Sequence, residues 1–339
     1  MEVAVVILNY NGKSYLEAFL PNVIKYSDDA EIWVVDNAST DDSVSFLKET
    51  HPDVNLLIND ENGGFAKGYN DGLKQIQADY YILLNSDAEV TPNWIKPCID
   101  LLESDEKIAA LQPKVLNQKD RTKFEHAGAA GGFLDTNYFP FCRGRIFEVV
   151  EEDKGQYDDN MEIFWATGAS LFIRSDLFHQ FGGFDEDFFA HMEEIDLCWR
   201  LKKCGYKIYY CGESTVYHVG GGTLNYMHPK KTYLNFRNSL YTIFKNHEGS
   251  LFKLFIRMTI DGVAAVMFIG KFQFKHFSAV WTAHVAVYKN WGSLRRKRKI
   301  IKKQSTHFNA SGLYKKNITL KKFLGGLRSF KELKAKDFH

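Results

Sequence analysis

Short apolar runs alternate with amphipathic stretches along the first hundred residues. The apolar runs cover residues 3–8, 31–35, 54–58 and 80–84. Such an alternation is typical of repeated βα units, in which each strand is followed by a helix that packs on the sheet. The pattern therefore predicts an α/β fold class for the amino-terminal part of the chain.

Three of the predicted strands end in short polar clusters. Asn9 opens the turn 9–12, Asp36 follows the second strand, and the triplet 85–87 (Asn, Ser, Asp) follows the fourth. In open parallel sheets, ligands bind at the carboxyl ends of the strands. These clusters are therefore the first candidates for a binding site.

The later parts of the chain have a different character. Residues 118–160 are rich in turns and glycine, and we expect loops or an antiparallel insertion there. Residues 251–288 are strongly apolar, but Lys253, Arg257 and Asp261 interrupt them at four-residue spacing and fall on one helical face. Because no uninterrupted run of about 18 apolar residues occurs, a helix lying in a membrane surface is favoured over a spanning helix.

The charge of the chain is unevenly distributed. The net charge is only +1, but residues 295–339 hold 15 Lys and Arg against 2 Asp and Glu, which leaves 28 against 40 in residues 1–294. A basic end on an acidic body suggests an anionic membrane surface or nucleic acid as a partner. Trp281, Tyr288 and Trp291 precede the basic end, as aromatic side chains do at a membrane interface.

The cellular compartment is predicted from the amino terminus and the cysteines. The first residues run directly into a strand pattern rather than into a secretory signal. The five cysteines are an odd number without paired metal spacing, which indicates free thiols in a reducing compartment and makes zinc improbable. We therefore expect a cytoplasmic protein, peripheral at the inner face of the cell membrane.

Two segments are candidates for binding a nucleotide. Asp36 would accept hydrogen bonds from a base N–H or a ribose hydroxyl, although Ser39 or Asp41 beside it would equally cap the next helix. The glycines of residues 62–70 would let backbone amides approach a diphosphate, but this spacing is not the dinucleotide fingerprint, and an ordinary loop explains it too.

Three further segments carry side chains suited to metal binding or proton transfer. Asp87 would hold a divalent cation together with phosphate oxygens and water, or it belongs to an ordinary turn. Residues 184–200 place carboxylates beside aromatic rings, which raises the pKa of a general base, although acidic residues also favour a helix amino terminus. His218, followed by glycines, would complete a metal site or serve as a structural histidine.

Taken in order, these segments resemble the family 2 glycosyltransferases with the GT-A fold, and in particular their bacterial rhamnosyltransferase-like branch. The matching segments are residues 6–12, 36–41, 62–66, 84–87, 167–169, 183–189, 193–197 and His218. The resemblance implies a mixed sheet flanked by helices, and the apolar pattern after residue 250 adds a helical, amphipathic extension at the carboxyl end. Together with the charge distribution, this predicts three parts, namely a catalytic domain over 1–248, membrane-associated helices over 249–294 and a basic tail over 295–339.

The resemblance also assigns roles to individual residues. Asp36 would bind the nucleotide base, and the other expected nucleotide-binding residues are Asn9, Asn62, Gly63 and Asn85. Asp87 is the metal-binding last residue of the family's Asp-x-Asp motif, in which Asn85 here replaces the first Asp, and His218 completes the metal site. Glu194 is the catalytic base, where Asp is usual in the family, and Glu193 and Asp196 are the fallback candidates. The residues expected at the junction of donor and acceptor are Trp165, Thr167 and Gly168.

These roles predict an inverting glycosyltransferase that uses Mg²⁺ or Mn²⁺. One base without an opposing carboxylate nucleophile favours a single displacement with inversion. The resemblance favours dTDP-rhamnose as the donor and a lipid-linked or polysaccharide acceptor in cell-surface glycan synthesis. The alternatives are a nucleotidyltransferase with a similar sheet, a catalytically inactive scaffold, and a nucleic-acid-binding protein. The last would use the basic end but would leave the strand-end carboxylates unexplained, so we expect no nucleic acid partner.

Overall fold

The four strands expected near the amino terminus form one side of a sheet. In the computed structural model, which describes residues 1–220 and 228–339, β1 (Val3–Asn9) pairs in parallel with β2 (Glu31–Asp36) and with β4 (Tyr80–Asn85). The strand β3 (Asn55–Ile58) pairs in parallel with β2. The predicted βα pattern is therefore confirmed for this half of the sheet.

The sheet continues beyond β4 with strands of both directions. β12 (Ser170–Arg174) is antiparallel to β4 and to β6 (Ile108–Asn117), while β13 (Lys207–His218) is parallel to β6. Two short strands, β5 (Ala88–Val90) and β11 (Met161–Ile163), are antiparallel to β13. Among the described residues the order is β11-β13-β6-β12-β4-β1-β2-β3, with β5 beside β13, so the expected mixed sheet is confirmed.

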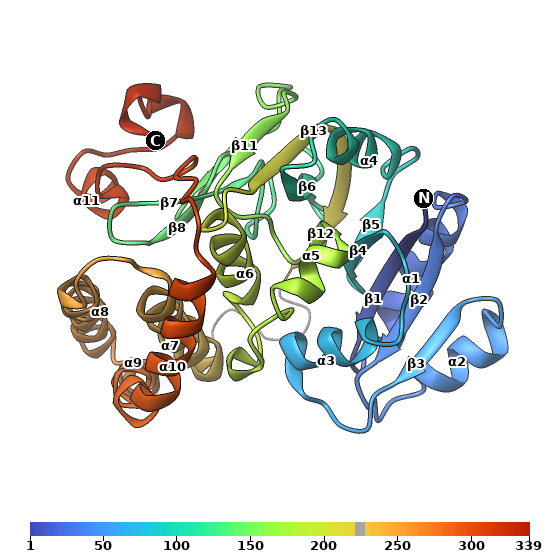
Figure 1. The fold of residues 1–339 in the computed structure, drawn as a ribbon, viewed down its shortest axis with the longest axis horizontal. Helices are drawn as coiled ribbons and strands as arrows, with labels where there is room; N and C mark the ends of the chain where they lie inside the picture. The colour runs from blue at the N-terminus through green and yellow to red at the C-terminus, as the bar shows by residue number, and fades with distance from the viewer. Residues whose placement is uncertain (221–227) are drawn as a thin grey trace.

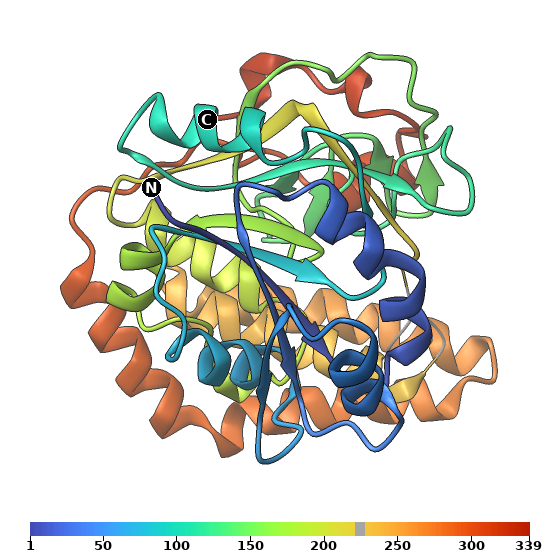
Figure 2. The ribbon, with the colours of Figure 1, turned by 90° about the vertical axis from the view of Figure 1, so that its right-hand side faces the viewer.

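Helices cover both faces of this sheet because the central strands are apolar on both sides. In β1, Val5 and Ile7 belong to the core under α1 (Lys13–Lys25), α2 (Ser43–Thr50) and α4 (Lys96–Glu103). Val6 belongs to the second core, under α3 (Gly64–Leu73), α5 (Ser175–Gln180) and α6 (Glu193–Lys202). Figure 1 and Figure 2 show the sheet between these two helical layers.

The turn-rich segment forms a small antiparallel sheet of its own. Its strands pair in the order β10-β9-β8-β7, and the expected antiparallel insertion within 118–160 is confirmed. The bounds of these strands are β7 (Gly132–Leu134), β8 (Pro140–Cys142), β9 (Arg145–Ile146) and β10 (Val149–Val150).

The carboxyl-terminal helices gather at the end of the molecule opposite to β1, β2 and β3 (Figure 1). They are α7 (Pro229–Asn246), α8 (Phe252–Gly270), α9 (Phe274–Lys289), α10 (Trp291–Gln304) and α11 (Ile318–Phe323). Within residues 1–220 and 228–339, none of the helices combines the length and the apolar character that a membrane span requires.

Residues 295–339, predicted as a basic tail, are folded onto the rest of the protein. The predicted boundary at residue 294 falls inside α10. After α10 the chain returns to the small sheet, where Tyr314 N donates to Leu134 O at 2.8 Å and the ring of Phe330 lies 4.9 Å from that of Phe133. The physical reason is that this segment carries its own apolar side chains, such as the fully buried Ile318, between the lysines.

Candidate active site

Asn9 and Asp36 lie side by side at the carboxyl ends of β1 and β2. Asn9 Nδ2 donates to Asp36 Oδ2 at 2.9 Å, and the backbone N–H of Ser39 donates to Asp36 Oδ1 at 2.8 Å. Both side chains are buried, and Asn9 Oδ1 has no hydrogen-bond partner among the described residues. A buried acceptor without a partner needs an explanation, and a ligand N–H would supply one here. The geometry is compatible with the predicted base-binding role.

The capping alternative holds in part, because Asp41 Oδ1 accepts from the backbone N–H of Ser43, the first residue of α2, at 3.1 Å. Helix α2 begins at Ser43 rather than at residue 39 or 41. Ser39 Oγ instead accepts from the backbone N–H of Asn11 at 2.9 Å, and Asp41 Oδ2 accepts from that of Lys13 at 3.1 Å. These two side chains therefore tie the loop after β2 to the loop after β1.

The glycine loop before α3 is shaped by close packing against another loop. Asn62 Oδ1 accepts from Gly64 N and from Asn37 Nδ2, both at 3.0 Å. Gly64 has a φ of +81°, and a Cβ there would stand only 2.4 Å from the carbonyl oxygen of Phe189. Glycine is required at this position because the backbones approach so closely. The loop that carries Asn62 and Gly63 is thereby joined to the segment that precedes the acidic residues of α6.

Asp87 and His218 meet at the predicted metal site. His218 ends β13, which pairs with β5, and its Nε2 lies 3.0 Å from Asp87 Oδ1 and 3.2 Å from Asn85 Nδ2. Burial disfavours the charged form of both Asp87 and His218, but the hydrogen bond and the attraction between them favour the charged forms more strongly. These interactions hold the pKa of Asp87 below its usual value and, with Glu125, raise the pKa of His218 to about 10. Gly221 and Gly222, which follow His218 in the predicted motif, lie outside the described residues.

The donor set at this site fits a divalent cation bound jointly with a substrate. Among the described residues no cluster of three or more His, Cys, Asp or Glu side chains is arranged as a metal site. Asp87 and His218 supply one oxygen and one nitrogen, and diphosphate oxygens and water would complete the shell.

Glu125 is a neighbour of this site that the motifs did not indicate. It is 1% exposed, and its Oε2 lies 3.6 Å from His218 Nδ1, on the side of the ring away from Asp87. No spacing rule relates a carboxylate in the turn-rich segment to a histidine at the end of a distant strand. The local sequence gives no signal of its burial, because charged residues at 119–123 precede it and His126 follows it.

Glu193 and Glu194 begin α6 after a strained loop. Phe189, His191 and Met192 all have positive φ, between 64° and 75°, which is unusual for residues with a Cβ. Strain of this kind persists where the surroundings hold it, often at functional sites. Both carboxylates have a buried Oε2 without a hydrogen-bond partner among the described residues, so each has an unused acceptor.

The three acidic candidates differ in their surroundings. Burial raises the pKa of Glu194 to about 7, while burial and the charge of Glu194 raise the pKa of Glu193 well above its usual value. Asp196 is fully buried and engaged: it pairs with Arg200 and Lys245, both at 2.9 Å. Glu194 is therefore the candidate whose pKa suits a base near neutral pH.

Of the residues predicted at the donor–acceptor junction, Trp165 packs on the small sheet, while Thr167 and Gly168 belong to a segment that contacts Asn85 and the glycine loop. Trp165 Nε1 donates to Phe133 O at 3.0 Å, and its ring lies against Gly132, so this side chain fixes the edge of the small sheet. Gly168 faces the ring of Phe65, which belongs to the glycine loop. Thr167 is buried and accepts from Ala169 N at 3.2 Å, and Ala169 O in turn accepts from Asn85 N at 3.1 Å.

The thiol of Cys142 is influenced both by Glu125, beside the predicted metal site, and by Glu194, the predicted base. Burial raises the pKa of Cys142 to about 11, and the charges of Glu125 and Glu194 both contribute to the rise. Both carboxylates thus lie within electrostatic reach of the same sulfur atom. Asn9, Asp36, Asn85 and His218 are the last residues of β1, β2, β4 and β13.

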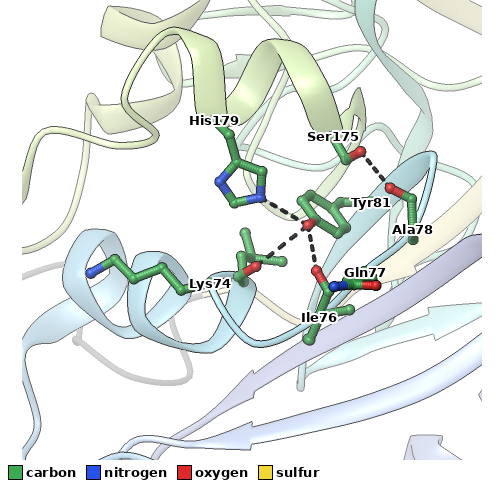
Figure 3. A pocket seen from close by; sticks show the side chains of 8 residues that line it. Lys74, Ile76, Gln77, Ala78, Tyr81, Ser175 and His179 are labelled. Atoms are coloured by element: carbon green, nitrogen blue, oxygen red, sulfur yellow. Dashed lines mark hydrogen bonds between the residues drawn. The ribbon is translucent and has the colours of Figure 1, made fainter.

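A hollow of about 400 Å³ at the other end of β4 is not part of this region (Figure 3). There Tyr81 Oη donates to Ile76 O at 2.7 Å and lies 2.9 Å from His179 Nε2, while Ser175 Oγ donates to Ala78 O. These polar atoms satisfy one another, and Tyr81 lies near the amino end of its strand, away from Asn85. We therefore assign the hollow no role in donor binding.

The chain is similar to two bacterial rhamnosyltransferases. The N-acetylglucosaminyl-diphospho-decaprenol L-rhamnosyltransferase of Mycobacterium tuberculosis is 25% identical over 230 residues, which are 63% of this chain and 75% of that protein. The rhamnosyltransferase WbbL of Escherichia coli is 25% identical over 219 residues, 61% of this chain and 80% of its own.

Solved structures agree on the fold. GalNAc-T7 with UDP, GalNAc and Mn²⁺ superposes with a TM-score of 0.56 at 18% identity, over 72% of this chain but only 48% of its own. The mannosyltransferase PcManGT from Pyrobaculum calidifontis, in complex with GDP-Man and Mn²⁺, gives 0.50 at 16% identity, over 89% and 85%. Residues 4–180, about half of the chain, match the family described as glycosyl transferase family 2. The chain therefore belongs to glycosyl transferase family 2, in its rhamnosyltransferase-like branch, and has the GT-A fold.

Proposed function

We propose that this enzyme transfers rhamnose from dTDP-rhamnose, with inversion and with a divalent cation, to a lipid-linked or polysaccharide acceptor in cell-surface glycan synthesis. The observation that carries the proposal is the pairing of Asp87 with His218 at a strand end that also presents Asn9 and Asp36. The choice of rhamnose rests on the names of the two bacterial relatives.

The chemistry follows from the groups at this sheet edge. The acceptor hydroxyl oxygen attacks the anomeric carbon, the bond from that carbon to the diphosphate oxygen breaks, and Glu194 takes the hydroxyl proton. The nucleoside diphosphate leaves with the electron pair. Mg²⁺ or Mn²⁺, held by Asp87 and His218, would supply the positive charge that the departing diphosphate requires. Since one base acts from one side and no sugar–enzyme bond is formed, the anomeric configuration inverts.

We further propose that α8 and α9 place the enzyme on an anionic membrane surface. Large apolar side chains of both helices face outward: Phe255 is 63% exposed, Phe272 between the helices 83%, and Trp281 64%. Residues 249–304 contain 12 Lys and Arg and a single acidic residue, Asp261, which is buried. An outward apolar surface with basic flanks fits the boundary between lipid headgroups and acyl chains. A position at the inner face of the cell membrane stays a prediction.

A donor panel tests the reaction. The purified chain would be incubated with dTDP-rhamnose, UDP-glucose, UDP-N-acetylglucosamine or GDP-mannose, each with an N-acetylglucosaminyl-diphospho-polyprenol and Mn²⁺. The expected result is release of dTDP from dTDP-rhamnose and a product whose glycosidic bond, by NMR, has the opposite anomeric configuration to the donor.

Other outcomes separate the alternatives. Release of a different nucleoside diphosphate would mean that the donor carries another sugar, but the protein would still be a glycosyltransferase. Release of pyrophosphate from a sugar phosphate and a nucleoside triphosphate would instead identify a nucleotidyltransferase. Absence of any transfer or hydrolysis across the panel would favour an inactive scaffold, for which the Asn85 and Glu194 departures from the family pattern would be the first explanation.

A further inference from the structure

His218 lies between two carboxylates that contact opposite sides of its ring. Nε2 faces Asp87 at 3.0 Å, and Nδ1 faces Glu125 at 3.6 Å, an ion-pair distance slightly longer than a hydrogen bond. Both side chains that flank the ring are buried, Asp87 at 8% and Glu125 at 1% exposure. The two ring nitrogens therefore have different neighbours, although both neighbours are acidic.

This arrangement matters for metal binding because a histidine ligates through a nitrogen that carries no proton. For Nε2 to offer its lone pair beside Asp87, the remaining proton of the neutral ring must stay on Nδ1. A carboxylate next to Nδ1 favours that tautomer, fixes the plane of the ring and makes the ligating nitrogen more basic. Glu125 occupies the place from which a carboxylate has these effects.

Glu125 is itself held in place by the backbone around it. Its N–H donates to Val115 O at 3.0 Å on β6, next to β13, and its Oε2 accepts from the backbone N–H of Ala127. Capping the turn at 125–127 alone would not require this depth, since burying a carboxylate is costly unless a partner offsets the cost. His218 is such a partner, and the charges of His126 and Lys231 also act on Glu125.

We infer that Glu125 is a positioning residue that holds the His218 ring with its proton on Nδ1, so that Nε2 is free to bind the divalent cation beside Asp87. The inference rests on the proposed metal dependence. It adds a residue that does not touch the cation, the donor or the acceptor and that acts through His218 alone.

Direct titration with Mn²⁺ tests this role without turnover. Free Mn²⁺ would be followed by electron paramagnetic resonance in the presence of dTDP, for the wild type and for Glu125→Gln. The expected result is Mn²⁺ binding weakened by about 10- to 100-fold in Glu125→Gln, the range for losing a partner of a ligating histidine. Glu89→Gln is the matched control, because Glu89 is a carboxylate on β5 that pairs with Arg121 instead, at 2.7 Å.

The tautomer gives a second measurement that needs no variant. In wild-type protein with Mg²⁺ and dTDP, ¹⁵N NMR of the His218 ring should find the proton on Nδ1. A proton on Nε2, or unchanged Mn²⁺ affinity in a folded Glu125→Gln protein, would overturn the inference. If Glu125→Gln does not fold, the Mn²⁺ titration is repeated with Glu125→Leu, and unchanged affinity in that variant would overturn the inference.

Two further variants separate this inference from the proposed metal site. Asp87→Ala and His218→Ala should abolish Mn²⁺ binding in the same titration. If neither changes it, the metal site itself is misassigned and the proposed function must be revised. If both abolish binding but Glu125→Gln and Glu89→Gln bind like the wild type, the metal site stands and the role of Glu125 fails.

Discussion

Arg257 and Asp261 form an ion pair on the inner side of α8, with Arg257 Nε donating to Asp261 Oδ1 at 2.9 Å. The two residues are only 4% and 1% exposed. Arg257 also donates to Tyr138 O at 3.2 Å and lies over the ring of Phe139. The side of α8 that carries this ion pair is thus turned toward the protein, together with Leu254 and Ala265, while large apolar side chains such as Phe255 are turned outward. A helix that packs on a soluble core through its apolar side would not leave such side chains outward.

The outward apolar side chains should govern a salt-resistant part of membrane binding. The triple variant Phe255→Ser, Phe272→Ser, Trp281→Ser should lose most of its partitioning to anionic vesicles at high salt, because burying each large apolar side chain is worth roughly 1.5–3 kcal/mol. Co-sedimentation of full-length proteins measures this.

Ile58→Ser is the matched control, because Ile58 is 52% exposed at the end of β3, far from α8. Equal partitioning of the triple variant and the control at both salt concentrations would contradict the membrane proposal. Point variants are preferable to truncation after residue 248, because truncation would also remove Phe330 from its contact with Phe133.

Three of the five consecutive basic residues at 295–299 should govern the salt-sensitive part of membrane binding. Lys297 pairs with Asp187 at 2.6 Å, and Arg298 donates to Phe244 O at 2.6 Å, so these two have internal partners. Arg295, Arg296 and Lys299 are exposed. Changing these three to Gln should weaken vesicle binding at low salt by up to about 3 kcal/mol, roughly 1 kcal/mol for each charge.

The high-salt binding of this triple variant should stay near that of the wild type. Lys297→Gln serves as the contrast. It should lower the melting temperature, because it loses internal ion pairs, and it should leave vesicle binding at low salt nearly unchanged. A result in which Lys297→Gln weakens low-salt vesicle binding as strongly as the triple variant would mean that the internal pairs do not persist at a membrane.

Glu194 should determine the acidic limb of the pH–rate profile. Burial raises its pKa to about 7, and a general base works only when deprotonated, so kcat should fall as pH is lowered through this value. Glu194→Gln should reduce kcat by about 10² or more and remove this limb, with donor binding by calorimetry nearly unchanged.

Glu193→Gln is the informative comparison for this prediction. Its carboxylate is buried more deeply, and we expect a smaller loss of kcat. If Glu193→Gln is the variant that loses activity while Glu194→Gln retains it, the base has been assigned to the wrong member of the pair.

Asn238 on α7 should hold the strained loop that leads into Glu193 and Glu194. Its Nδ2 lies 3.0, 2.8 and 2.7 Å from the carbonyl oxygens of Phe188, Ala190 and His191. Asn238→Asp replaces this donor by a carboxylate that repels the same oxygens. We expect kcat to fall by roughly 10- to 100-fold, because small displacements of catalytic groups are costly.

The pH profile distinguishes positioning from general destabilisation. A loosened loop would admit water to Glu194, and the apparent pKa of the acidic limb should move down from about 7 toward that of an exposed Glu. Asn55→Asp, where Nδ2 donates to Ile32 O at 3.3 Å near the start of β3, should leave both kcat and this limb unchanged. An unchanged acidic limb in active Asn238→Asp would contradict the proposed role.

Much of the fold and of the candidate site could be predicted because the relevant patterns are local. Apolar runs separated by helical periods predict strands whose carboxyl ends meet at one edge. Asp36 stands directly after one such run, and Asp87 ends the polar triplet that follows another. Their proximity to other motifs then follows from parallel pairing, as in the alignment of Asn9 with Asp36 between β1 and β2.

Local patterns alone thus predicted the α/β class, a candidate site at the strand ends and the order of the motifs. The packing of distant segments established which carboxylates are engaged: Asp196 pairs with Arg200 and Lys245, and Glu125 lies beside His218. It also decided that the side of α8 with the Arg257–Asp261 ion pair faces inward and that the basic end folds back on the small sheet. The physical reason is that helical period fixes which residues share a face, whereas the free energy of packing distant segments fixes what that face contacts.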